Sequence, residues 1–256
     1  MMTHMSNSSL VNFTRISPNK TSPRNHKIDT VTVHCVVGQC SVETLGNIFA
    51  ASSRRASSNY GVGQDGRIGL YCPEQDRSWC SSSSSNDNRA ITIEVASDNF
   101  YPYAVNDKAY ASLIKLLVDI CRRNGIPSLK WCGDKNLVGN IDKQNMTAHR
   151  WFAATDCPGE FLYSRMGKIA EEVNKQLNAT TYIMYKVQAG AFSKKENADN
   201  YCKQLVAKGY PAFVTNPGMY YKIQVGAFRS KENAEAMKNK LAADGISAFV
   251  YEVICS

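Results

Sequence analysis

Three residues whose side chains bind zinc stand far apart in this sequence. His149 and Cys157 lie eight positions apart, and Pro158-Gly159 closes the segment that holds them. One helical face does not join positions at this spacing, so a loop has to bring Cys157 back beside His149. Imidazole and thiolate are preferred zinc ligands, and His34 is the candidate for the third ligand.

These residues would make a site that activates water. Three protein ligands leave a fourth zinc position open, and the metal lowers the pKa of water in that position to about 7. Glu94 is the candidate base, which would take a proton from the water and pass it to a leaving amine. Thr155 would donate a hydrogen bond to the oxyanion that develops on a carbonyl. Together these groups suit the hydrolysis of an amide.

A simpler explanation exists for each residue taken alone. Histidines at strand ends and buried thiols are common in protein cores, and a lone carboxylate such as Glu94 more often lies on the surface. Asp156 is the rival third ligand, although the softer thiolate of Cys157 suits zinc better. Cys35 follows His34 and points to the opposite face of the strand, which predicts a role in packing.

Two predicted strands carry His34 and Glu94. Residues 28–35 and 90–96 both alternate between apolar and polar side chains, which is typical of strands with one apolar face. Val33 marks the apolar face of the first strand, and His34 lies at the strand's end on the other face. Glu94 likewise lies opposite the isoleucines of the second strand. The imidazole and the carboxylate are therefore expected on the same kind of polar face.

Helices follow from caps and apolar stripes. Ser41 is a predicted N-cap for a short helix over 41–49. A longer helix is predicted from Asp107 to a stop at Gly125, and a last one over 160–177.

Turn residues and composition predict the structure of the remaining segments in the first 177 residues. An Asp-Gly turn joins two short strands within 59–71, and a further strand is predicted around 129–132. The Ser-rich stretch 78–89 is too polar for a core and is expected to be a loop. Residues 1–27 are expected to form a tail and a surface arm.

The end of the chain repeats itself. Tyr-Lys-Val-Gln-Ala-Gly-Ala-Phe over 185–192 returns as Tyr-Lys-Ile-Gln-Val-Gly-Ala-Phe over 221–228, 36 residues later. A Lys-Glu-Asn-Ala segment follows each copy at the same offset. Each unit reads strand, helix, strand, so the pair predicts a small α+β domain of βαββαβ order.

Composition limits the partners without choosing one. The chain has 256 residues, 43% of them hydrophobic, a formal charge of +8 and a pI near 9.0. The charge favours polyanionic partners, which include nucleic acid, anionic lipid and an acidic wall polymer. No stretch approaches membrane-spanning length, and the first ten residues lack the apolar core of a secretory signal peptide. The nine cysteines are odd in number and irregularly spaced, which favours reduced thiols.

Four segments taken in order resemble the type-2 N-acetylmuramoyl-L-alanine amidases. They are the strand that ends at His34, the 59–68 turn segment, Ile-Thr-Ile-Glu94-Val-Ala, and Thr-Ala-His149 with Thr155-Asp-Cys157-Pro-Gly. The resemblance covers about residues 11–177 and is greatest to endolysin and prophage amidases of clostridia. It implies an α/β fold with a mixed central sheet flanked by helices, a fold shared with peptidoglycan recognition proteins.

The same resemblance implies the site and the reaction. Zn²⁺ would be held by His34, His149 and Cys157, and the enzyme would cleave the amide between N-acetylmuramic acid and L-alanine. Glu94 falls at the acidic catalytic position of many members. Thr155 takes a position that is Lys in several phage enzymes. Ser58 replaces a tyrosine that some members use, so Glu94 has to carry more of the catalysis.

The repeated region resembles the SPOR domain, which implies a sheet that binds the glycan strands of peptidoglycan. Gln188, Gln224, Tyr185 and Tyr221 are its candidate sugar contacts, whereas the phenylalanines that end the two motifs, at 192 and 228, are predicted to be core.

The sequence therefore predicts an amidase domain over 1–177, a linker over 178–184 and a SPOR-like domain over 185–256. The predicted partner is peptidoglycan, with the stem peptide at the first domain and the glycan strand at the second, and not nucleic acid. The protein is expected to be made in the cytoplasm and to reach the wall after release by a holin or by mother-cell lysis. The alternative is a recognition protein that binds peptidoglycan without cutting it.

Overall fold

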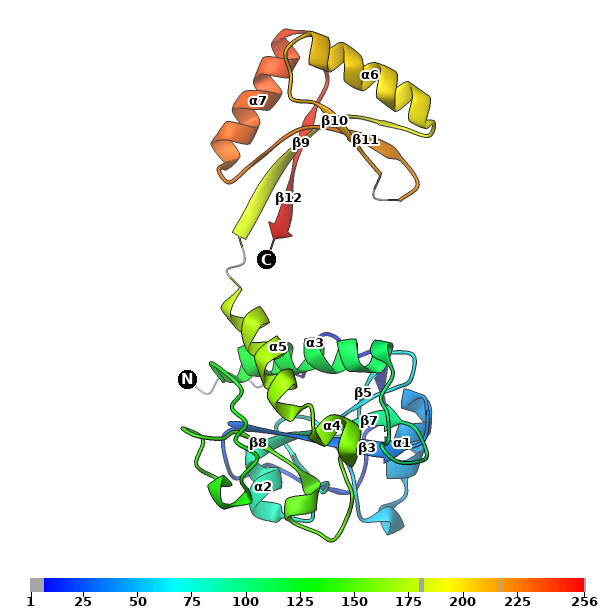
Figure 1. Ribbon diagram of the computed structural model, residues 1–256, viewed down its shortest axis with the longest axis vertical. Helices are drawn as coiled ribbons and strands as arrows, with labels where there is room; N and C mark the ends of the chain where they lie inside the picture. Colours follow the sequence, from blue (N-terminus) through cyan, green and yellow to red (C-terminus); the bar gives the residue numbers. More distant parts are fainter. Residues whose placement is uncertain (1–6, 180–181, 217, 256) are drawn as a thin grey trace. The chain divides into compact units, whose positions relative to one another are not determined.

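Two main sheets organise the computed structural model, which describes residues 7–179, 182–216 and 218–255 (Figure 1). Contacts divide the chain into a first unit, Met1–Asn178, and a second unit, Ala179–Ser256. Residues 1–6 of the expected N-terminal arm and residues 180–181 of the expected linker lie outside the described residues.

A mixed six-stranded sheet forms the centre of the first unit. Its strand order is β1-β5-β4-β7-β3-β8, and every neighbouring pair is parallel except the β4–β5 hairpin. The strands are β1 (Phe13–Thr14), β3 (Thr30–Val37), β4 (Tyr60–Val62), β5 (Ile68–Leu70), β7 (Ala90–Ser97) and β8 (Met146–Thr147). The predicted strands around His34 and Glu94 are the two longest and lie side by side.

Helices flank this sheet, as the family resemblance implied. Figure 1 shows α3 and α5 together on one side of the sheet and α2 on the other. The helices are α1 (Val42–Ala50), α2 (Ser84–Arg89), α3 (Asp107–Asn124), α4 (Gly159–Tyr163) and α5 (Met166–Asn178). The predicted cap of α1 is confirmed, because the Ser41 side chain accepts a hydrogen bond from the backbone N–H of Thr44. The stop of α3 is confirmed as well, since Gly125 adopts φ 66° and its N–H bonds to the Cys121 carbonyl.

The two faces of β3 and β7 are both buried, but by different means. Val31, Val33 and Ile93 belong to the apolar core beneath α3 and α5. On the other face, the hydroxyls of Thr32 and Thr147 are hydrogen-bonded at 2.8 Å. The predicted alternation is therefore confirmed. The strand continues to Val37, so His34 lies inside it and not at its end.

The prediction of a polar loop over 78–89 is wrong. This segment contains the end of β6 (Arg77–Ser78) and all of α2, and Ser81, Asn86 and Asp87 are buried. Asn86 donates to the Thr32 hydroxyl at 3.0 Å, and the Ser81 hydroxyl donates to the Asp87 carboxylate at 2.6 Å. Serine and asparagine are buried here because the sheet face that they cover is itself polar and satisfies their hydrogen bonds.

Two further boundaries differ from the sequence prediction. No strand forms over 129–132, because side chains take the place of a neighbouring backbone: Asn145 accepts from the Lys130 N–H at 2.7 Å, and Gln144 accepts from the Cys132 N–H at 3.0 Å. The helix predicted over 160–177 is two helices, α4 and α5, separated at residues 164–165.

The expected surface arm is more deeply embedded than predicted. It contributes β1 to the main sheet, and β2 (Lys20–Thr21) pairs with β6. Arg24 is buried and its guanidinium donates to backbone carbonyls, including those of Glu74 at 2.6 Å and Asn88 at 2.8 Å. Residues 7–27 are therefore part of the fold.

The second unit has the predicted βαββαβ order. Its elements are β9 (Tyr182–Phe192), α6 (Lys195–Ala207), β10 (Phe213–Thr215), β11 (Tyr221–Phe228), α7 (Lys231–Ala243) and β12 (Phe249–Cys255), and the sheet order is β10-β11-β9-β12. Leu205 of α6 and Leu241 of α7 pack on the same core as the central strands. Phe192 and Phe228 pack against this core, which confirms their predicted role.

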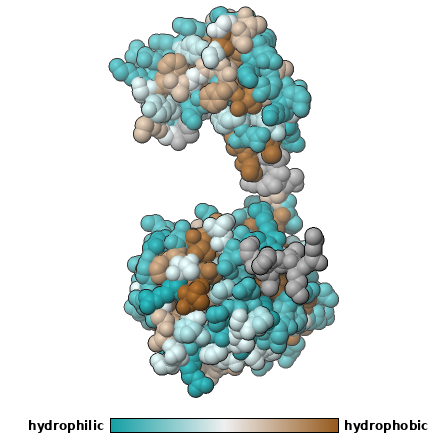
Figure 2. Space-filling model, turned by 180° about the vertical axis from the view of Figure 1, so that it is seen from behind, coloured by the Kyte–Doolittle hydropathy of each residue, from teal (hydrophilic) through white to brown (hydrophobic). Residues whose placement is uncertain are grey.

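The surface of both units is mostly hydrophilic on the face that Figure 2 shows, with apolar side chains in small groups. Within the described residues, no helix has both the length and the apolar character needed to cross a bilayer.

Candidate metal centre

Strand register places His34 beside Glu94. In the parallel pairing of β3 with β7, His34 is the direct partner of Glu94, two positions after Thr32 pairs with Thr92. Side chains at paired positions of parallel strands point to the same face, and such strands lie about 4.8 Å apart. The imidazole and the carboxyl group are therefore neighbours, as the two sequence patterns predicted.

His149 reaches the same place through the short edge strand β8. Met146 and Thr147 pair with Val31 and Thr32 of β3, and the 3₁₀ turn His149–Trp151 begins two residues later. The rings of His34 and His149 lie with their centroids 5.1 Å apart and their planes inclined at 59°.

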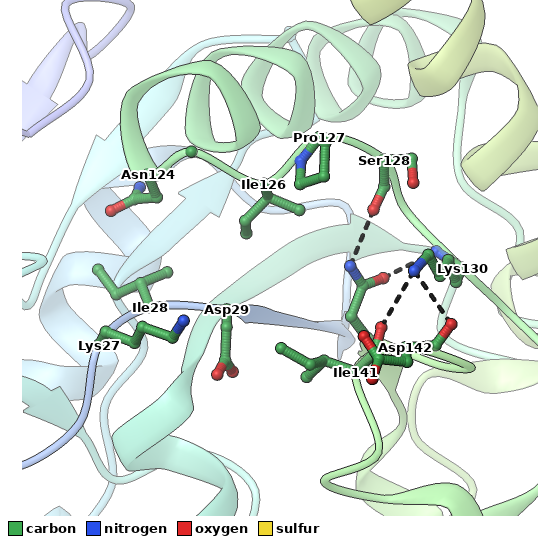
Figure 3. Close-up of a pocket in the computed structure, with 12 residues that line it drawn as sticks. Lys27, Ile28, Asp29, Asn124, Ile126, Pro127, Ser128, Lys130, Ile141 and Asp142 are labelled. Carbon is green, nitrogen blue, oxygen red and sulfur yellow. Dashed lines mark hydrogen bonds between the residues drawn. The ribbon is translucent and has the colours of Figure 1, made fainter.

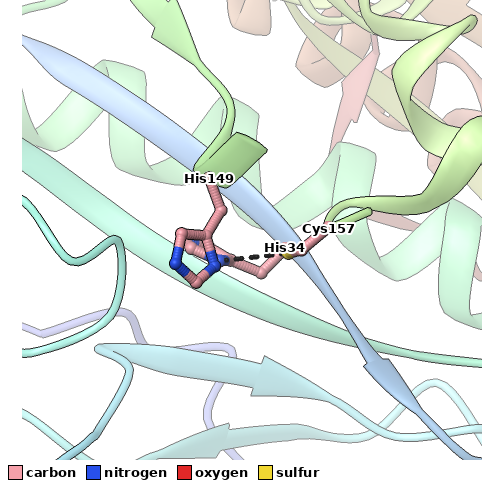
Figure 4. Close-up of side chains that lie close together, drawn as sticks. All are labelled: His34, His149 and Cys157. Atoms are coloured by element: carbon pink, nitrogen blue, oxygen red, sulfur yellow. Dashed lines mark hydrogen bonds between the residues drawn. The ribbon is translucent and has the colours of Figure 1, made fainter. Parts of the chain in front are cut away.

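The loop between His149 and Cys157 is held in place by several contacts and brings Cys157 back to the two imidazole rings. The Arg150 N–H bonds to the Cys157 carbonyl at 3.1 Å, and the Arg150 guanidinium lies 4.2 Å from the centre of the Tyr163 ring. Trp151 stacks on Trp131 with ring centroids 5.0 Å apart. As a result, Cys157 Sγ lies 3.3 Å from His34 Nδ1 (Figure 4).

The three side chains fit a zinc ion. One ligand atom from each of His34, His149 and Cys157 lies within 4.8 Å of the others. Tetrahedral zinc with ordinary bond lengths needs ligand atoms about 3.3–3.8 Å apart, so small side-chain movements would complete the site. Imidazole and thiolate are both zinc ligands, and catalytic zinc sites have three protein ligands and keep a fourth position open.

The two imidazoles are unprotonated near neutral pH, which favours a bound cation. Burial, with the neighbouring His149 as a smaller cause, lowers the pKa of His34 to about 3, and burial also lowers the pKa of His149. Both rings are therefore neutral near pH 7 and have a lone pair for a metal. A hydrogen bond to Cys35, and then burial, raise the pKa of the Cys157 thiol, an effect that a coordinated cation reverses.

Glu94 is a buried carboxyl group with one uncommitted oxygen. Its Oε1 accepts from Cys80 Sγ at 3.8 Å, whereas its Oε2 is buried and has no hydrogen-bond partner in the described part of the chain. Burial raises the pKa of Glu94 to about 7. A carboxyl group with this pKa can both accept and donate a proton at neutral pH.

Thr155 lies next to the candidate ligands, on the exposed side of the loop. Its hydroxyl oxygen accepts from the Cys157 N–H at 3.2 Å, which leaves its own O–H free to donate. Thr155 lines a hollow of about 250 Å³ together with Cys35 and Cys157. Cys35 packs against the apolar core as predicted, and its thiol also reaches Cys157, a contact that the prediction did not include.

Ser58, which replaces a tyrosine that some family members use, and the nearby Tyr60 both lie in the interior. Ser58 is fully buried and donates to the Tyr60 carbonyl at 2.7 Å. Tyr60 is also fully buried, and its hydroxyl donates to Glu74 at 2.7 Å. Both side chains are committed to the interior.

Sequence reasoning missed Cys80 at this site. Its sulfur belongs to a second group of ligand atoms, with His34 and Glu94, that lie within 4.8 Å of one another. Cys80 stands in the Ser-rich stretch that was expected to be a loop. No periodic pattern marked it.

A cleft of about 440 Å³ opens beside the candidate ligands. It is lined by His149, Cys80, Trp79 and two arginines, Arg55 and Arg77, with serines of the 82–84 stretch on its rim. The described contacts give Arg55 no side-chain hydrogen bond or ion pair. Its charge is therefore available to a ligand.

A different hollow lies at the start of β3 (Figure 3). Two of its charged side chains are already bonded within the protein: Asp29 accepts from Arg89 at 2.8 Å, and the Lys130 ammonium donates to the Asp142 carbonyl at 3.0 Å.

Comparison with family models identifies the family of the chain. The sequence model described as N-acetylmuramoyl-L-alanine amidase matches residues 24–160, more than half of the chain. The chain belongs to the N-acetylmuramoyl-L-alanine amidase family. It is accordingly an enzyme that hydrolyses the amide bond between N-acetylmuramic acid and L-alanine in peptidoglycan, which decides against the non-catalytic alternative. The SPOR domain model matches residues 183–252. No curated protein matches the chain.

Solved structures are similar to the amidase in parts. The peptidoglycan-binding domain of the Bacillus subtilis cell wall lytic enzyme CwlC is 37% identical and covers 31% of this chain and 98% of its own, with a TM-score of 0.27. The endolysin amidase LysCS from Clostridium intestinale URNW is 19% identical over 68% of this chain and 100% of its own, with a TM-score of 0.46. A mutant endolysin from Bacillus subtilis is 18% identical over 64% of this chain and 99% of its own, with a TM-score of 0.45.

Proposed function

We propose that this amidase is zinc-dependent, that His34, His149 and Cys157 hold the metal, and that Glu94 moves the protons of the reaction. The observation that carries the proposal is the convergence of three ligand atoms within 4.8 Å beside a buried carboxyl group. When bound, zinc would polarise the scissile carbonyl and lower the pKa of a water molecule.

The residues of the chain have separate tasks in this mechanism. The neutral rings of His34 and His149 give lone pairs to the metal. Glu94 accepts the proton of the attacking water at its unpartnered Oε2 and then delivers it to the leaving amine of L-alanine. The Thr155 hydroxyl donates to the oxyanion as the carbonyl becomes tetrahedral.

We infer that the cleft beside His149 receives the stem peptide. Stem peptides carry carboxylates, and the guanidinium groups of Arg55 and Arg77 in the cleft wall offer them positive charge. Trp79 adds an aromatic surface. Arg55→Ala is expected to raise KM more than it lowers kcat, because the arginine binds the substrate away from the reacting bond.

We infer that glycan strands lie across the helix-free face of the second unit. Strand register places Phe213, Gln224, Gln188 and Phe249 in one row across all four strands. The phenylalanines at the ends are 48% and 51% exposed, whereas the two glutamines in the centre are 6% and 8% exposed. Rings that stack on sugars therefore offer most of the accessible surface for an oligosaccharide. Tyr185 and Tyr221 are half-buried and pack against the core, so only part of each side chain is available to a sugar.

Linking the two units would keep the amidase at its polymer substrate through a raised local concentration. Release by a holin or by lysis of the mother cell stays a prediction.

Digestion of purified peptidoglycan tests the catalytic assignment. Glu94→Gln and Cys157→Ser are both expected to lower the release of free L-alanine amino ends by at least about 100-fold, but only Cys157→Ser should lose the ion that His34, His149 and Cys157 hold. Metal content is measured on the same samples by mass spectrometry. Glu171→Gln, at an exposed position of α5, is the matched control and should remain active. Full activity in Glu94→Gln or Cys157→Ser would refute that residue's role.

A further inference from the structure

A second group of metal-ligating side chains shares His34 with the candidate zinc site. It joins His34 of β3, Glu94 of β7 and Cys80, which follows β6, and one ligand atom from each lies within 4.8 Å of the others. Register fixes His34 and Glu94 as neighbours, and the Cys80 thiol already contacts Glu94 Oε1 at 3.8 Å.

Two atoms of this group are buried without a hydrogen-bond partner in the described residues. They are His34 Nε2 and Glu94 Oε2. His34 is completely buried, and its other nitrogen, Nδ1, faces Cys157 at 3.3 Å. Leaving a buried polar atom unpaired costs about 1–3 kcal/mol, so two such atoms in one group indicate that something else binds there.

The donor set defines what would bind. An imidazole nitrogen, a sulfur and a carboxylate oxygen suit Zn²⁺ and the softer Cd²⁺. Mg²⁺ and Ca²⁺ prefer oxygen ligands and do not suit this group. The two nitrogens of one imidazole can serve two ions, one at Nδ1 beside Cys157 and one at Nε2.

We propose that His34, Cys80 and Glu94 form a second binding site for Zn²⁺ or a similar soft divalent cation, and that an ion bound there inhibits the enzyme. When both ions are bound, the metal replaces the Cys80 thiol proton and the remaining N–H proton of the His34 ring, and both protons go to solvent. Glu94 as a ligand can no longer accept a proton from water. The inhibition rests on the proposed role of Glu94, whereas the binding does not.

Metal titration of the full-length protein tests the binding. Metal-free protein is dialysed against increasing Zn²⁺, and bound zinc is measured by mass spectrometry. Wild type is expected to bind two ions and Cys80→Ser one, while Cys157→Ser keeps the Cys80-dependent ion. Cys132→Ser replaces an exposed cysteine outside both groups and should bind as wild type does. Repeating the titration with Co²⁺ adds a spectrum, because each cobalt–thiolate bond absorbs in the near ultraviolet.

Activity at increasing Zn²⁺ tests the inhibition. Relative to its own maximum, Cys80→Ser is expected to need at least about tenfold more zinc for half inhibition than wild type. Binding of a single ion by wild type, or two ions bound by both Cys80→Ser and Glu94→Gln, would overturn the second site. The two proposals fail separately: normal hydrolysis by Cys157→Ser would refute the catalytic assignment and leave the Cys80-dependent ion in place.

Discussion

Replacing Glu94 by glutamine removes an ionisable group from the interior of the first unit with almost no change in volume. In the metal-free protein, burial raises the pKa of this carboxyl group from 4.5 to about 7. The unfolded chain therefore loses this proton near pH 4.5, while the folded protein holds it to about pH 7. The contribution of Glu94 to wild-type stability is accordingly full below pH 4.5 and declines as the pH rises towards 7.

The size of this decline follows from the shift. One pKa unit corresponds to 1.36 kcal/mol, so a shift of about 2.5 units lowers the free energy of unfolding by about 3 kcal/mol between pH 4.5 and pH 8. Glutamine does not ionise, so Glu94→Gln should escape this loss. The advantage of the variant over wild type is therefore expected to grow by about 3 kcal/mol across this range. His34 titrates in both proteins, and its effect cancels in the difference.

Urea unfolding followed by tryptophan fluorescence measures this difference. All three tryptophans, at 79, 131 and 151, belong to the first unit and report on its unfolding alone. Glu171→Gln makes the same substitution at an exposed position and shows what the exchange itself costs. A free-energy difference between Glu94→Gln and wild type that is the same at pH 4.5 and pH 8 would refute a buried, ionisable Glu94.

Three further predictions use the same measurements. Removing zinc with a chelator should lower the Tm of the first unit reversibly, because saturation at 100 times Kd stabilises a protein by about 2.7 kcal/mol; an unchanged Tm would contradict a bound metal. Asn86→Ala should destabilise the first unit by about 1–3 kcal/mol in urea, since it leaves the buried hydroxyls of Thr32 and Thr147 without their amide partner. A decrease in the free energy of unfolding below 0.5 kcal/mol, a value of about RT, would show that this hydrogen-bond network does not stabilise the first unit. Leu241→Ala should destabilise the second unit by about 2–5 kcal/mol, seen as faster proteolysis, without moving the tryptophan transition. A shifted transition would mean that the units unfold together.

The sequence predicted best where a local pattern and burial agree. The alternation around His34 and Glu94 was sufficient because an apolar core lies on one face of β3 and β7, and the cap at Ser41 needed only its own turn. The 36-residue repeat predicted the whole order of the second unit. The alternation of apolar and polar residues does not predict the register between two strands. His34 pairs with Glu94, and not with Thr92, because of the packing of the complete sheet.

The errors share a physical cause. Polar composition predicted a loop over 78–89 because polar side chains usually face water, yet here they cover a polar sheet face and bond to it. Side chains of Asn174, Asn145 and Gln144 bond to the backbone N–H groups of residues 129, 130 and 132, so no strand ladder forms there. Cys80 stayed hidden because a ligand placed by tertiary contacts has no fixed spacing from its partners.

The repeated second unit has a consequence for fragments of this protein. The helices of both repeats contact both central strands, β9 and β11, so each repeat covers part of the other's sheet. The two strands of one repeat are not neighbours in the order β10-β11-β9-β12, so a fragment with only one repeat would leave both strands unpaired and apolar side chains exposed. Because the repeats are alike, two copies of such a fragment could each supply the missing half of the other. Its folding would then depend on protein concentration, whereas both halves of the sheet belong to one molecule in the intact chain.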